Sequence, residues 1–175
     1  MTRRTTLKAL HWLSFGLMGY FFLVEPENVR QLGGAALATH AGMGTILAIV
    51  VTVWLVMYLR KGLASRPGPK LPGWARTAHG WMHRAMMWGS FAVVLSGALA
   101  GFAAPYAIHL FGLIPFFPGV GSQGLHDTFS DLHELAFDVM VIGVVAHVVF
   151  HVWRHYAVRD NALRIMAPKV LHKYL

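Results

Sequence analysis

The sequence contains no cysteine and few charged residues. Of its 175 residues, 7 are Asp or Glu and 13% are charged, whereas a soluble domain has about a quarter. Without cysteine the chain can form neither disulfide bonds nor thiolate metal sites, and it cannot hold an iron–sulfur cluster through cysteine. Hydrophobic residues make up 56% of the chain. These values indicate an integral membrane protein with a single domain, residues 1–175.

Four apolar segments are long enough to cross a bilayer as helices, which takes about 20 residues. We expect these helices at residues 7–24, 37–59, 81–104 and 131–156. They predict an all-α fold, a transmembrane four-helix bundle. The first segment also has the outline of a secretory signal peptide. No cleavage-site pattern follows it, which favours an uncleaved transmembrane helix.

The connection at 105–130 contains an apolar run, IHLFGLIPFF, that is too short and too interrupted to span a membrane. We expect it to lie at the membrane interface as a lid. Asp131 and Glu134 have the spacing of a capping box, which predicts that the fourth helix begins there. A short surface segment at 161–175 follows that helix, and Asn161 is its candidate cap.

Positive charge is distributed unevenly over the connections. Fourteen of the fifteen Lys and Arg residues precede the first helix, surround the second connection or follow the fourth helix, and only Arg30 falls on the other side. The positive-inside rule therefore predicts that both termini are cytoplasmic. The net charge of +8 is explained by topology, so we expect no nucleic-acid partner.

Histidines occupy matching depths on three of the predicted helices. His133 and His147 are fourteen residues apart, close to four turns, so they share one face of the fourth helix about 21 Å apart. His40 and His133 are predicted at the same depth near the outer side of the membrane. His11 is predicted at the depth of His147 or His151 near the cytoplasmic side. Each could be a core histidine bonded to a neighbouring helix, but ionisable groups at this depth are costly and usually functional.

Two facing imidazoles inside a bundle suit haem iron, which takes axial ligands on both sides of its ring. Iron with two axial histidines has no open position, so such haems pass electrons, and two of them form a path across the membrane. Glycines near the histidines would leave room for a flat macrocycle, although close helix packing also uses them. They are Gly16, Gly19, Gly42, Gly44 and Gly143.

The chain resembles the bacterial cytochrome b561 family, which are four-helix dihaem membrane proteins. The matching motifs are LKALHW, LATHAGMG, MHRAMMW followed by LSG, and LHELAFDVMVIGVVAH with RHYAVRDNALRIM. The resemblance implies two haem b groups in the bacterial inner membrane. It also implies their axial ligands: His11, His40, His133 and His147.

The same resemblance implies a function. Members exchange electrons with the quinone pool, and some oxidise superoxide with ubiquinone as acceptor, so we expect a superoxide:ubiquinone type of oxidoreductase. The spacing of His133 and His147 is also similar to that in cytochrome b subunits of formate dehydrogenases and hydrogenases. The alternative is therefore an anchor subunit that passes electrons for a periplasmic partner. A histidine-lined metal transporter is weaker, because the spans contain no carboxylate pair.

His83 and His151 are candidates for positioning or protonating quinone at the cytoplasmic side, because imidazole titrates near neutral pH. A packing role is the alternative for both. The predicted outer face is acidic, so its charge would steer the superoxide anion poorly and does not favour superoxide as the donor. The remaining histidines are expected at the surface or the interface: His79, His109, His126, His155 and His172.

One departure from the family concerns the second helix. The family often carries an arginine late in this helix, where it would hold a haem propionate, and Trp54 occupies that place here. The substitute candidates are Arg60, Arg76 and Arg84.

Overall fold

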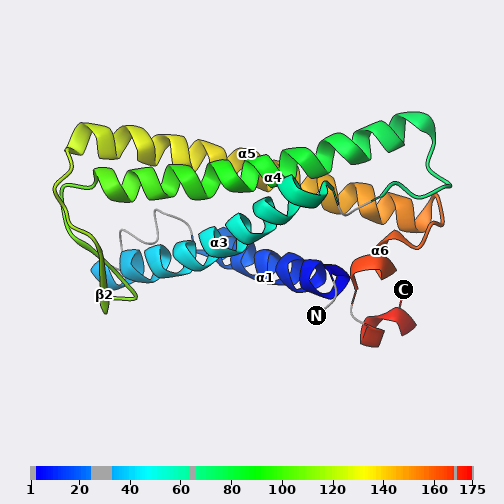
Figure 1. Cartoon of the computed structure of the whole chain (residues 1–175), viewed down its shortest axis with the longest axis horizontal. Helices are drawn as coiled ribbons and strands as arrows, with labels where there is room; N and C mark the ends of the chain where they lie inside the picture. The colour runs from blue at the N-terminus through cyan, green and yellow to red at the C-terminus, as the bar shows by residue number, and fades with distance from the viewer. Residues whose placement is uncertain (1–2, 25–32, 64–65, 168, 175) are drawn as a thin grey trace.

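The computed structural model describes residues 3–24, 33–63, 66–167 and 169–174, and it is a helical bundle (Figure 1). Its long helices form two antiparallel pairs, α1 with α3 and α4 with α5, and α3 also packs against α4. The predicted all-α bundle is confirmed. The helices are α1 (Arg3–Leu23), α3 (Gly34–Lys61), α4 (Gly73–Ala103) and α5 (Gln123–Tyr156).

Three of these helices, α3, α4 and α5, are long and apolar enough to cross a membrane. Their large apolar side chains face outward: Ile49 is 60% exposed, Ile142 69% and Val149 61%. Surfaces of this kind mark contact with a membrane or with another protein. The fourth long helix, α1, has 21 residues and packs against α3, but its first turns carry Arg3 and Lys8, which lower its hydropathy.

Helix α4 begins at Gly73, before the predicted start at 81. The extra turns are polar, so hydrophobicity alone did not reveal them. Pro72 is the N-cap residue, where its fixed φ suits the entry into a helix. The guanidinium of Arg76 donates to the carbonyl oxygens of Leu71 (2.9 Å) and Pro69 (2.8 Å), which holds the preceding loop against the first turn.

Helix α5 begins at Gln123, so the predicted start at Asp131 is wrong. The cap is Ser122, whose hydroxyl accepts a hydrogen bond from the backbone N–H of Leu125 (3.4 Å). The polar residues that resembled a loop form the first turns of this helix. His133 consequently lies well inside α5 instead of at its first turn.

The connection between α4 and α5 contains a β-hairpin that the sequence did not predict. Its strands, β1 (Ile108–Leu110) and β2 (Ile114–Phe117), pair antiparallel with an irregularity after Ile108. Phe111 ties the hairpin to α3, because its backbone N–H donates to the carbonyl of Ala38 (2.9 Å). The phenyl ring of Phe111 lies where a side chain at Gly42 would sit, so this glycine permits the contact.

A short segment follows α5, as predicted, and consists of α6 (Ala162–Met166) and the 3₁₀ helix η1 (Lys169–Lys173). Asn161 precedes α6 in a left-handed conformation (φ 58°), but its side chain does not cap the helix. Asp160 does so instead, accepting from the N–H of Ala162 (3.0 Å). Asn161 thus occupies the N-cap position, as predicted, but the capping side chain is that of Asp160.

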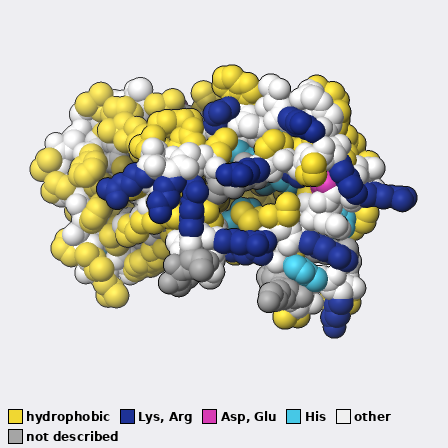
Figure 2. Space-filling view, turned by 45° about the vertical axis from the view of Figure 1, so that its right-hand side comes forward, with side chains coloured by type: hydrophobic (Ala, Val, Ile, Leu, Met, Phe, Trp, Pro, Cys, Tyr) yellow, Lys and Arg dark blue, Asp and Glu magenta, His cyan; other side chains and the backbone are white. Residues whose placement is uncertain are grey.

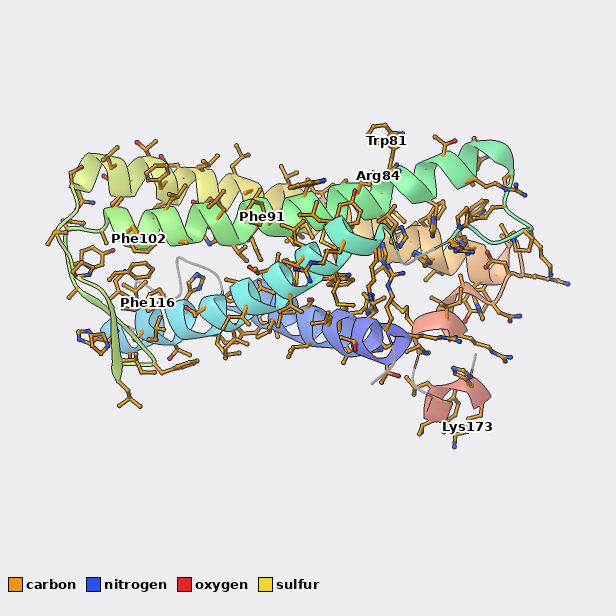
Figure 3. The ribbon with its side chains drawn as sticks, viewed as in Figure 1. Trp81, Arg84, Phe91, Phe102, Phe116 and Lys173 are labelled. Carbon is orange, nitrogen blue, oxygen red and sulfur yellow. The ribbon has the colours of Figure 1, made fainter. Side chains whose placement is uncertain are left out.

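The bundle has two chemically different ends. We call the end with the β-hairpin (residues 108–117) the hairpin end, and the opposite end, where α1 begins and α5 ends, the terminal end (Figure 1). Lys and Arg side chains gather over the terminal end, and histidines are visible among them (Figure 2). Between the ends, an apolar core from α1 and α3, including Leu17, Phe21 and Val51, packs against Phe91 of α4 (Figure 3).

Candidate functional site

The histidine pair at the hairpin end joins α3 to α5. The rings of His40 and His133 have centroids 6.2 Å apart and are nearly perpendicular, at 88°. The Nδ1–H of His133 donates to the carbonyl oxygen of Val93 (2.9 Å), which leaves the Nε2 lone pair available to a metal. Nδ1 of His40 is buried and has no hydrogen-bond partner among the described residues.

Gly97 of α4 gives His133 its position. A Cβ at Gly97 would lie 2.9 Å from Cε1 of His133, closer than real Cβ contacts. The imidazole therefore lies directly against the α4 backbone. The hydroxyl of Ser96 is also near, 3.3 Å from Nδ1. The LSG motif at 95–97 thus supplies the surface that holds this ring.

The second pair, at the terminal end, joins α1 to α5. The centroids of His11 and His147 are 6.4 Å apart, with 41° between the rings. Nδ1 of each ring is buried, and within the described part of the chain neither has a hydrogen-bond partner. Buried polar atoms are normally hydrogen-bonded, so such orphans indicate a missing partner.

Both spacings fit a metal ion between two imidazoles. A metal–nitrogen bond of about 2 Å, and about 1 Å from that nitrogen to the ring centre, place two centroids roughly 6 Å apart. The centroids of His147 and His151 are only 4.5 Å apart, and those of His83 and His147 are 5.2 Å apart, too close for the same arrangement. The residues present therefore fit two bis-histidine haems.

The glycines near these pairs divide into two groups. Gly16, Gly19 and Gly44 have no atom within 4 Å of an added Cβ, so they border open space. Gly42 and Gly143 instead contact side chains, of Phe111 and Met86 respectively, at their Cβ positions. Open space and close packing thus both occur, at different glycines.

The structure separates His147 from His151, the two candidates for the inner pair. The ring of His151 contacts those of His79 and His83, at 5.9 and 5.5 Å. His11 contacts His147 instead. His83 and His151, the candidates for a quinone or proton role, lie together beside His147.

His79 is a residue that the sequence analysis misplaced. It was expected at the surface, yet it is 1% exposed and its ring lies 4.2 Å from that of His83. His155, also expected at the surface, is buried as well. The four-residue spacing of His79 and His83, which places both on one helix face, was the available signal. It was missed because His79 lies before residue 81, where the helix was predicted to begin.

A buried ion pair lies beside these histidines. Arg154 of α5 donates from Nε (2.8 Å) and from its terminal nitrogen (2.6 Å) to one carboxylate oxygen of Asp160, and both side chains are at most 2% exposed. Both lie within electrostatic reach of His79. A side chain at Gly68 would collide with the Asp160 carboxylate, so the 66–72 loop lies directly on the pair.

None of the three arginines proposed to replace the family's arginine lies beside Trp54. Arg60 is exposed, and Arg76 binds loop carbonyls. Arg84 is exposed and stacks outside the bundle on Trp81, 5.7 Å from the ring centroid (Figure 3).

Arg3, which the sequence analysis did not consider, lines a small hollow of about 20 Å³ together with Trp54 and Tyr58. Its guanidinium donates to the carbonyl oxygens of Lys61 (3.2 Å) and Gly62 (3.0 Å). Arg3 thus lies near Trp54, the place where the resemblance led us to expect an arginine.

The family model for prokaryotic cytochrome b561 matches residues 3–169, nearly the whole chain. No curated protein matches the chain.

Proposed function

Because the chain belongs to the prokaryotic cytochrome b561 family, and is thus a multi-pass bacterial membrane b-type cytochrome in electron transfer, we propose that it conducts electrons between its two ends through two haems. The observation that carries the proposal is the pair of facing histidines at each end, with centroids 6.2 and 6.4 Å apart. His40 and His133 would hold one haem b, and His11 and His147 the other.

When bound, a haem with two histidine ligands exchanges single electrons and has no vacant position for a substrate. The chain supplies ligand orientation and an apolar surrounding. The carbonyl of Val93 fixes the tautomer and ring orientation of His133. The core of Leu17, Phe21 and Val51 between the two pairs excludes water from the path.

Charge supports an orientation of the bundle in the membrane. Lys and Arg gather at the terminal end (Figure 2), so this end and both termini would face the cytoplasm of a bacterial inner membrane. Electrons would enter at the hairpin end from an outer donor, superoxide being one. They would leave at the terminal end to ubiquinone, which takes up two electrons and two protons to become ubiquinol.

His83 and His151 are the candidates for contact with quinone. Each is partly buried beside His147, with ring centroids 5.2 and 4.5 Å from that of His147. Once protonated on both ring nitrogens, an imidazole there would donate a hydrogen bond to a quinone oxygen and hand over its proton. The chain alone would then be a complete oxidoreductase.

A second candidate function is an anchor subunit for a periplasmic dehydrogenase or hydrogenase. Exposed apolar side chains at the hairpin end favour it: Leu113 is 82% exposed and Val120 83%. If the purified chain alone, given an outer donor, reduces ubiquinone, the anchor function is rejected.

Haem content tests the main proposal. A pyridine haemochrome assay on the purified protein should give two haem b per chain, and the oxidised spectrum should show only six-coordinate low-spin iron. One haem per chain, or a high-spin signal in the intact protein, would contradict the assignment of two histidine pairs.

A further inference from the structure

Three histidines at the terminal end are not needed by either ligand pair. His79 and His83 lie one turn apart on α4, and His151 faces them from α5. One ring nitrogen of each lies within 4.8 Å of those of the other two. We call His79, His83 and His151 the histidine triad.

Ring nitrogens of His83 and His151 are available for ligation. The Nδ1–H of His83 donates to the carbonyl of His79 (2.8 Å), which fixes the tautomer and leaves the Nε2 lone pair free, as in histidines that bind metals. Nε2 of His151 is buried and lacks a hydrogen-bond partner in the part of the chain that the structure describes.

The spacing also suits one ion. Tetrahedral coordination with metal–nitrogen bonds of about 2.0–2.1 Å places ligand nitrogens about 3.4 Å apart. The triad nitrogens, now within 4.8 Å of one another, would have to approach by little more than about 1 Å to reach this spacing. Small rotations about side-chain bonds allow such a movement. Two histidines four residues apart on one helix, completed by a third from another helix, are an arrangement that zinc sites use.

The local charge is partly balanced. Arg154 lies within electrostatic reach of all three triad histidines, and its carboxylate partner Asp160 accepts two hydrogen bonds from it and offsets part of its charge. The triad itself consists of imidazoles, which are neutral when they bind a metal. A divalent ion would thus enter a site with no net charge of its own.

We propose that the histidine triad binds a divalent transition-metal ion of the class that prefers imidazole, such as Zn²⁺, with water completing its coordination. Imidazole ligands suit zinc, copper and nickel, whereas Mg²⁺ and Ca²⁺ prefer oxygen. The site lies beside the inner haem pair and is additional to both haems. The metal and the proposed quinone role use the same two imidazoles, His83 and His151, so they exclude one another at any moment. The proposal does not rest on quinone reduction, since metal binding is measured without turnover.

The test is zinc binding to the haem-loaded, tag-free protein in detergent. Equilibrium dialysis against Zn²⁺, with bound metal counted by mass spectrometry, should show one saturable site per chain. His79→Ala and His151→Ala should each weaken binding at least about tenfold. The matched control is His109→Ala, which removes an exposed histidine at the hairpin end and should bind zinc like the wild type.

A second measurement needs no variant. X-ray absorption at the zinc edge of the wild-type protein should show imidazole scattering from three ligands at about 2.0–2.1 Å. The proposal is overturned by the absence of a saturable site, by equal zinc affinity in wild type and both variants, or by a spectrum without imidazole ligands. If a variant loses haem or fails to fold, the wild-type spectrum alone decides.

Discussion

The two ends of the bundle hold their histidines in different ways. At the hairpin end His40 faces His133, and the Val93 carbonyl and Gly97 fix the latter. At the terminal end the ring of His147 contacts His11, His83 and His151. The first end thus has a facing histidine pair alone, whereas the second has additional imidazoles beside its pair. The comparison suggests that proton and metal chemistry belong to the terminal end.

The largest expected effect is the presence or absence of reporter activity, which tests whether the two ends face opposite sides of the membrane. A reporter that is active only in the cytoplasm, fused after Leu175, should be active, because the terminal end carries the positive charge. The same reporter inserted after Leu113, at the exposed tip of the hairpin, should be inactive. Activity is measured in intact cells, and the reverse pattern would turn the assignment of the ends around.

The next largest effect separates the two pairs. His133→Ala should remove one of two haems, or make it high-spin, because the hairpin end has no second imidazole beside His40 in the described structure. Haem quantification and reduced-minus-oxidised spectra measure the loss. The haem at His11 and His147 should keep its spectrum, and loss of that signal alone would show that the pairing is wrong.

Stability at the terminal end depends on the buried ion pair. Asp160→Asn leaves Arg154 buried without its carboxylate, which should lower the free energy of unfolding by about 3 kcal/mol. Thermal unfolding followed by haem absorbance measures it. Asp127→Asn, an exposed carboxylate on α5, is the control and should change stability by less than about 0.5 kcal/mol. Equal effects of the two changes would mean that the buried pair has no special role.

The rate of ubiquinone reduction should depend on His83 and His151 at the terminal end and not on His126 at the hairpin end. His83→Ala or His151→Ala should reduce steady-state ubiquinone reduction at least about tenfold, the low end for a lost general acid, while both haems remain. His126→Ala, which removes a histidine bonded to Tyr106 at the hairpin end, is the matched control. Unchanged rates in both terminal-end variants would move the quinone site to the hairpin end.

The smallest effect concerns how His133 is held. Gly97→Ala adds a Cβ 2.9 Å from its ring, so the imidazole must shift by a few tenths of an ångström. We expect a small shift in the spectrum or potential of one haem, with two haems retained. Gly124→Ala, where an added Cβ meets no atom within 4 Å, is the control. If both variants match the wild type, Gly97 does not set the position of His133.

Helix interiors and depths were predictable because the rise of a helix is fixed. Residue counting placed His40 level with His133, and the structure brings them together. Helix starts were less predictable, since capping depends on local contacts. Asp131 had a plausible pattern, but Ser122 provides the cap, and polar residues that look like a loop continue α5. The hairpin was missed because strands this short carry little signal of their own.

The sequence by itself determined the helical class, the asymmetry of charge and the matching depths of the histidines, because hydropathy, charge and helical period are local properties. Only the tertiary structure decided that His147 rather than His151 faces His11, that His79 is buried beside His83, and that Arg3 lies near Trp54. These depend on how each helix is rotated about its axis. Packing between helices sets that rotation, and no single helix encodes it.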